Sequence, residues 1–132
     1  MTDLFQIATF KSHAGLDLDW KIECDALNTK EWECIAKMIM ELTQPFQVAV
    51  GVPRGGIKLG KLLNEYATGD EKDPVCIVDD VLTTGGSMEV FYQKHLHVQS
   101  ILGNKAFTAF GWVVFARNQP PNWVKALFQM PF

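Results

Sequence analysis

The 132-residue chain contains few of the residues that build disulfide frameworks or metal sites. Its three cysteines, Cys24, Cys34 and Cys76, are an odd number without C-x-x-C spacing, so we interpret them as reduced thiols, chiefly small core residues. The three histidines are too dispersed to predict a zinc site. No secretory signal and no long apolar span is visible, so we expect a soluble cytoplasmic protein that contacts no membrane.

The chain also lacks a basic run. Its 12 basic residues are scattered, the net charge is -3 and the pI is about 5.5, which argues against a nucleic-acid partner. A hydrophobic content of 48% and an aromatic content of 11% exclude a disordered chain. A chain of this length has room for one hydrophobic core, so we predict a single domain over residues 1–132.

Apolar runs alternate with helical patterns along the chain. Residues 18–22 alternate apolar and polar side chains, as a half-buried strand does, whereas residues 5–10 fit either a short strand or a helix end. Asn28 and Glu31 have the spacing of a capping box, which predicts a helix start. The remaining predicted elements are strands near 46–51, 75–79, 107–116 and 123–128, and helices near 57–67 and 86–98. This alternation predicts an α/β fold, a small parallel sheet with helices on both faces.

The most informative segment is residues 75–88, which reads V-C-I-V-D-D-V-L-T-T-G-G-S-M. Its apolar start is long enough for a buried parallel strand. Asp79 and Asp80 follow, and paired carboxylates can accept hydrogen bonds from a sugar diol or lie near a cation. The loop of Thr, Gly and Ser after them suits a phosphate at a helix start. One site would then bind a diol and a phosphate about one sugar apart.

A second loop has similar properties. Residues 46–51 read as a strand, and V-P-R-G-G follows it and leads into a helical pattern. Arg54 would donate to phosphate oxygens, and Gly55 and Gly56 would let the backbone approach a ligand. Gly55, Gly60 and Lys61 also match the spacing of a Walker A loop, but Leu62 occupies the position of the magnesium-binding Ser or Thr, so we reject that match.

Together these loops resemble the type I phosphoribosyltransferase family. Residues 75–88 look like its motif for 5-phosphoribosyl-1-diphosphate (PRPP), and residues 51–56 are similar to its pyrophosphate loop. The resemblance implies that Asp79 and Asp80 are the catalytic pair and hold the ribose hydroxyls. It assigns PRPP and its 5-phosphate to Asp79, Asp80, Val81, Leu82, Thr83, Thr84, Gly85, Gly86 and Ser87. It assigns pyrophosphate to Val52, Pro53, Arg54, Gly55 and Gly56.

The resemblance also implies a cofactor, a partner and a division of the chain. Mg²⁺ would be held by oxygens of the ligand, not directly by the protein, with Asp79 and Asp80 near it. The partners would be PRPP, a nucleobase and a second copy of the chain in a homodimer. Residues 1–25 would form the segment on the base side, and residues 26–132 the PRPP-binding core.

The start of the chain narrows the expected base. Residues 10–25 resemble the beginning of orotate phosphoribosyltransferases, in which a lysine of the first turn touches the substrate. Aligned on Gly15, His13 occupies that lysine's position and Lys11 lies two residues earlier. Lys11 and His13 are therefore base-side candidates, and a simple polar turn between strands is the alternative.

The family's catalytic loop is missing or much shortened here. In the family it lies between the two motifs and closes over the substrates, whereas this chain has only residues 57–74 there, most of them in a helical pattern. Two functions remain open. One is phosphoribosyl transfer to a nucleobase, with orotate as the expected base. The other is a non-catalytic regulatory module that binds PRPP or a nucleotide.

Overall fold

The computed structural model describes residues 4–11, 17–104 and 107–130. Its centre is a four-stranded sheet in the order β3 (Val48–Gly51), β4 (Val75–Leu82), β5 (Ala109–Ala116) and β6 (Val124–Gln129). All three pairings are parallel. The apolar runs of β4 and β5 are buried over most of their length, as expected for strands covered on both faces. The predicted parallel α/β fold is therefore confirmed.

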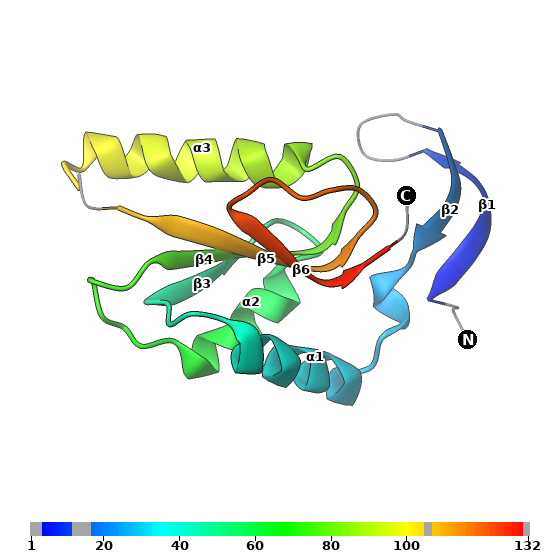
Figure 1. The fold of residues 1–132 in the computed structure, drawn as a ribbon, viewed down its shortest axis with the longest axis horizontal. Helices are drawn as coiled ribbons and strands as arrows, with labels where there is room; N and C mark the ends of the chain where they lie inside the picture. Colours follow the sequence, from blue (N-terminus) through cyan, green and yellow to red (C-terminus); the bar gives the residue numbers. More distant parts are fainter. Residues whose placement is uncertain (1–3, 12–16, 105–106, 131–132) are drawn as a thin grey trace.

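Helices cover the two faces of this sheet (Figure 1). On one side lie α1 (Thr29–Leu42) and α2 (Ile57–Leu63), and on the other lies α3 (Gly86–Ile101). The strand period of two divides the core between these layers. In β4, Cys76 and Val78 belong to the cluster packed against α1 and α2, whereas Val75 and Ile77 pack with Met88 of α3.

The predicted capping box begins α1. Asn28 Oδ1 accepts from Glu31 N at 2.8 Å, and Glu31 Oε1 accepts from Asn28 N at 3.0 Å. The apolar face that follows is buried, with Ile39 and Ala36 almost completely covered. Trp112 Nε1 of β5 donates to Thr43 Oγ1 at the end of the helix, 3.0 Å away. Both ends of α1 are thus fixed by side chains.

The chain begins with an antiparallel hairpin of β1 (Phe5–Lys11) and β2 (Asp17–Ile22). The alternative left open for residues 5–10 is therefore decided in favour of a strand. The hairpin forms a sheet of its own and lies beyond the carboxyl ends of the parallel strands (Figure 1). A short 3-10 turn, η1 (Cys24–Ala26), connects it toward α1.

Several element boundaries differ from the sequence prediction. β4 continues to Leu82, so both acids lie within the strand and not after it. α2 ends at Leu63 and tightens into the 3-10 turn η2 (Asn64–Tyr66). α3 extends to Ile101. Neighbouring strands and turns decide where these helices and strands end. The propensities of a short sequence window carry no information about such neighbours.

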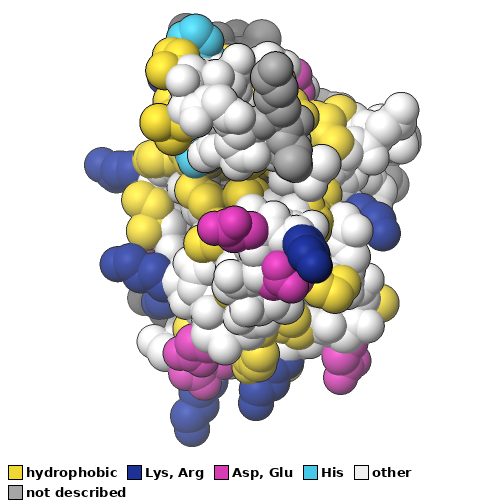
Figure 2. All heavy atoms as spheres, turned by 90° about the vertical axis from the view of Figure 1, so that its left-hand side faces the viewer, with side chains coloured by type: hydrophobic (Ala, Val, Ile, Leu, Met, Phe, Trp, Pro, Cys, Tyr) yellow, Lys and Arg dark blue, Asp and Glu magenta, His cyan; other side chains and the backbone are white. Residues whose placement is uncertain are grey.

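Leu96 lies on the apolar side of α3 in the sequence but is 39% exposed, because Met88 and Tyr92 face the sheet and Leu96 is rotated toward the flank of the helix. Val98, Ile101 and Leu102 at the end of the helix are also exposed, and Figure 2 shows hydrophobic side chains gathered at this end of the molecule. Within the described residues, no helix has both the length and the apolar character needed to span a bilayer.

The outer edge of the sheet, at β3, is closed by a side chain. Asn64 Nδ2 donates to Ala49 O at 2.8 Å, and Ala49 N donates to Asn64 Oδ1 at 2.7 Å. Next to this pair, Thr68 N and Gly69 N donate to the carbonyls of Phe46 and Gln47. The amide of Asn64 thus occupies the groups that a further strand would pair with.

We expect Asn64→Ala to lower the free energy of unfolding by about 1–2 kcal/mol, because two backbone groups of the edge strand lose their partner. Denaturant unfolding measures the change. Glu65→Ala, at an exposed position on the same turn, is the control and should leave stability unchanged. Equal stability of the two variants would contradict the assigned role of Asn64.

Candidate active site

The acid pair lies near the carboxyl end of β4, and its two members have different surroundings. Asp79 is only 8% exposed, whereas Asp80 is half-buried. Asp79 Oδ1 accepts from Asp80 N at 2.8 Å, and Asp80 Oδ1 accepts from Val81 N at 2.7 Å. These bonds fix the two carboxyl groups against the backbone, and the one with access to solvent is Asp80.

Burial raises the pKa of Asp79 from its ordinary 3.8 to about 8. The side-chain hydrogen bond with Asp80 and the charge of Asp80 add to the effect, and the bond from Asp80 N opposes it. The pKa of the buried Cys24 thiol is raised as well, chiefly by burial and next by the charge of Asp80. Cys24 belongs to η1, so the turn after the hairpin lies close to the acid pair.

The loop after β4 ends in a left-handed glycine. Gly85 has φ of +84° and is the N-cap residue of α3, without a side-chain cap on the helix. Thr84 Oγ1 accepts from Gly86 N at 3.3 Å. The first turn of a 16-residue helix therefore presents backbone N–H groups near two threonines and a serine, which suits an anion. The positive φ explains why glycine is required at position 85.

The loop after β3, residues 52–56, packs directly on the acid strand. Val52 N donates to Val78 O at 2.8 Å. A Cβ atom on Gly56 would lie 2.8 Å from Val52 N and 3.0 Å from Asp79 Cα. One on Gly55 would lie 2.5 Å from Asp80 Cγ. The two glycines thus bring the loop backbone into contact with both acids, so the two predicted motifs form one site.

The remaining predicted residues are less defined. Arg54 is exposed and follows a cis peptide bond from Pro53. Lys11 is the last residue of β1, and His13 lies outside the described residues. The role predicted for each of these residues stays a prediction.

Two polar residues of this edge were not found from the sequence. Arg117 and Asn118 follow β5, which pairs with β4, and Arg117 N donates to Leu82 O at 2.8 Å. Asn118 Nδ2 donates to Thr83 O in the loop of the PRPP-like motif. The sequence did contain a signal for these two residues, because they directly follow the apolar run of a strand. In a parallel sheet, the polar residues after one such run lie beside those after the next.

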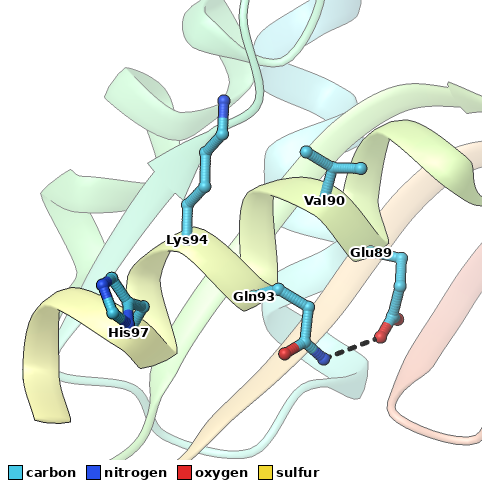
Figure 3. Close-up of a pocket in the computed structure, with 5 residues that line it drawn as sticks. All are labelled: Glu89, Val90, Gln93, Lys94 and His97. Atoms are coloured by element: carbon cyan, nitrogen blue, oxygen red, sulfur yellow. Dashed lines mark hydrogen bonds between the residues drawn. The ribbon is translucent and has the colours of Figure 1, made fainter.

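A shallow hollow lies on the surface of α3, away from the acid pair and the two loops (Figure 3). It is lined by Glu89, Val90, Gln93, Lys94 and His97, which all stand on α3. Gln93 Nε2 donates to Glu89 Oε1 at 3.0 Å. None of the predicted site residues lines this hollow.

The donor set near Asp79 and Asp80 is small. Among the residues that the structure describes, no three His, Cys, Asp or Glu side chains are grouped as a metal site would require. Two adjacent carboxyl groups fit Mg²⁺ only if most of its ligands come from a bound phosphate and from water.

We expect Gly56→Ala to destabilise the protein by about 1–3 kcal/mol, because its Cβ would meet backbone atoms of β4 and of Val52, which cannot move aside cheaply. Gly86→Ala is the matched control. Its Cβ would lie 3.5 Å from Thr84 Oγ1, an ordinary contact, so stability should stay within about 0.5 kcal/mol. Thermal or denaturant unfolding measures both, and a neutral Gly56→Ala would contradict the close packing of this loop.

The raised pKa of Asp79 predicts a pH dependence of stability. Between about pH 4 and pH 8 the native state keeps a proton that the unfolded chain releases, so the free energy of unfolding should fall as the pH rises. Asp79→Asn should flatten this slope, because the amide is neutral throughout. Glu33→Gln, at an exposed position on α1, should keep the wild-type slope. Unfolding curves at several pH values measure it, and an unchanged slope in Asp79→Asn would refute the assignment.

No family model and no curated protein matches the sequence. Solved structures do match the fold. Orotate phosphoribosyltransferase from Aeropyrum pernix superposes with a TM-score of 0.72 at 17% identity, over 96% of this chain and 88% of that one. The Mycobacterium tuberculosis orotate phosphoribosyltransferase gives 0.63 at 14%, over 95% and 88% of the two chains. Xanthine-guanine-hypoxanthine phosphoribosyltransferase from Helicobacter pylori gives 0.50 at 13%, over 76% and 90%. The chain therefore has the type I phosphoribosyltransferase fold.

Proposed function

We propose that this protein binds PRPP at the carboxyl edge of its parallel sheet and transfers the phosphoribosyl group to a nucleobase, with orotate as the base. The observation that carries the proposal is the contact between Gly55 and the Asp80 carboxyl group. Because of it, an acid pair, a phosphate-type loop and a glycine-rich loop with an exposed arginine share one site.

In this proposal each loop binds one part of the ligand. Asp80, with Asp79 behind it, accepts hydrogen bonds from the ribose hydroxyls. Residues 81–87 bind the 5-phosphate through backbone N–H groups and hydroxyls at the start of α3. Residues 52–56 bind pyrophosphate, with Arg54 as the forked donor. Lys11 and His13 are the candidates for contact with the base.

The proposed reaction depends more on how the protein positions the two reactants than on covalent bonds to the protein. A nitrogen of the base forms a bond to C1 of the ribose as the bond from C1 to the pyrophosphate oxygen breaks. Pyrophosphate leaves with that electron pair, and the proton of the base nitrogen is released to pyrophosphate or water. The transition state is oxocarbenium-like, so the protein contributes by aligning the ring and by stabilising the departing charge. Mg²⁺, when bound to the ligand's oxygens beside Asp79 and Asp80, would neutralise part of that charge.

One observation favours a second function, PRPP binding without turnover. The connection of residues 67–74 between the two motifs is held at the amino end of the sheet. Thr68 N and Gly69 N donate to the carbonyls of the two residues just before β3, and Thr68 Oγ1 lies 2.6 Å from Asp73 Oδ2. A further bond joins Gln47 Nε2 to Asp73 O at 3.1 Å. This connection does not reach the opposite edge, so it cannot serve as the segment that closes over the reacting centre in transferases.

We also propose a cellular environment and an oligomeric state for the protein. All three cysteines are free, which supports a reducing, cytoplasmic environment. The exposed apolar residues Val98, Ile101 and Leu102 support a homodimer, in which a second chain covers surface that one chain leaves open.

We expect Asp80→Asn to weaken PRPP binding by about 1.5–3 kcal/mol, because it removes a charge-assisted hydrogen bond to the ribose. Asp79→Asn should cost less at pH 7, because burial already keeps much of that carboxyl group protonated. Calorimetry with PRPP and Mg²⁺ measures both, and Glu33→Gln is the control. Unchanged affinity in Asp80→Asn would refute the site.

The same preparations separate the two functions. Pyrophosphate release from PRPP, followed with orotate and with a panel of other bases, tests transfer, and light scattering gives the mass at the assay concentration. Binding of PRPP with turnover far below about 1 per second would support the regulatory module. Ordinary turnover with orotate would establish the transferase and refute the argument from the short connection.

A further inference from the structure

We infer that Asn118, held by Gln129, is a positioning residue that fixes the phosphate loop from outside it. The inference rests on the proposed function, because it concerns how that loop is held for a phosphate group. It deepens the proposal by extending the site to the linker between β5 and β6, residues 117–123.

This linker touches the phosphate loop and α3 at three successive places. Asn118 Nδ2 donates to Thr83 O, at the start of the loop. The Pro121 ring lies 3.9 Å from the position that a Cβ on Gly85 would occupy. Trp123 Nε1 donates to Glu89 Oε2 at 3.1 Å, in the first turn of α3. One linker therefore lies against the loop at Thr83 and Gly85 and against α3 at Glu89.

The end of the linker at Trp123 is also anchored. The rings of Trp123 and Tyr92 lie 4.7 Å apart between centroids, at an angle of 30°. Glu89, which accepts from Trp123, is also held by Gln93, as Figure 3 shows. Trp123 O accepts from Gly111 N of β5 at 2.8 Å. The linker is thus fixed to both α3 and the sheet.

Gln129 of β6 holds the near end. Its Nε2 lies 3.2 Å from Ala116 O, 3.3 Å from Asn118 O and 3.2 Å from Met130 O, so its two hydrogens are shared among these acceptors and restrain the carbonyls on both sides of Arg117. The side chain of Asn118 is then presented to Thr83 from a backbone that is itself restrained. The chain of contacts runs from Gln129 through Asn118 to Thr83.

The bond to Thr83 O sets the direction of the next N–H group. A trans peptide places its C=O and N–H on opposite sides, so a carbonyl turned toward Asn118 turns Thr84 N–H away from it. The loop offers its N–H groups to an anion only if these peptides keep their orientation. Asn118 therefore pre-organises the loop, and it does so without touching the ligand.

The test compares Asn118→Ala with Asn122→Ala, which changes an exposed residue of the same type in the same linker. The first measurement needs no ligand. In backbone NMR relaxation, the order parameters of residues 83–87 should be lower in Asn118→Ala than in the wild type, with the same global unfolding midpoint, because the peptide between Thr83 and Thr84 loses the hydrogen bond that fixes its orientation. Asn122→Ala should match the wild type. Asn118→Asp keeps the size but cannot donate to Thr83 O, so it serves as the second variant if Asn118→Ala does not fold.

The second measurement is calorimetry with ribose 5-phosphate and with inorganic phosphate. Asn118→Ala should bind ribose 5-phosphate about three- to tenfold more weakly, and Gln129→Ala should show a smaller loss. Unchanged order parameters and unchanged affinity in Asn118→Ala would overturn the inference. If the wild type binds neither probe while the order parameters still respond to Asn118→Ala, the proposed function fails and the role of Asn118 in holding Thr83 O stands.

Discussion

The backbone of Gly55 lies against the Asp80 carboxyl group with no room for a side chain between them. Several features of the site and of the sheet depend on this contact. It requires β3 and β4 to be adjacent and parallel, because only then do their two loops leave the same edge of the sheet. It also favours glycine at position 55, where a Cβ would meet the Asp80 carboxyl group. A ligand that enters this edge meets both loops at once.

The two carboxyl groups have separate electrostatic roles. Burial keeps Asp79 largely protonated near neutral pH, so it can donate as well as accept a hydrogen bond. Asp80 has access to solvent and lies beside the glycine-rich loop. The two acids therefore differ, because burial favours the neutral form of Asp79 and Asp80 is the one open to a ligand. A neutral Asp79 would lower the repulsion that a phosphate meets at this edge.

The sequence predicted the layers of the fold and the loops of the site because those features are local. The apolar runs of β4 and β5, the capping box at Asn28 and the glycines after each strand are all visible in short windows. What escaped prediction depends on distant parts of the chain. Asn64 closes the edge of β3 from 15 residues away, and Asn118 reaches Thr83 across 35 residues. Neither partner can be recognised until the strand order is known.

The connection of residues 67–74 has a kinetic consequence. It is bound to the two residues just before β3, at the end of the sheet opposite the acid pair. Entry of a ligand at the carboxyl edge therefore need not wait for this segment to open and close. With respect to this segment, the residence time of a ligand would depend on the strength of the ligand's own contacts.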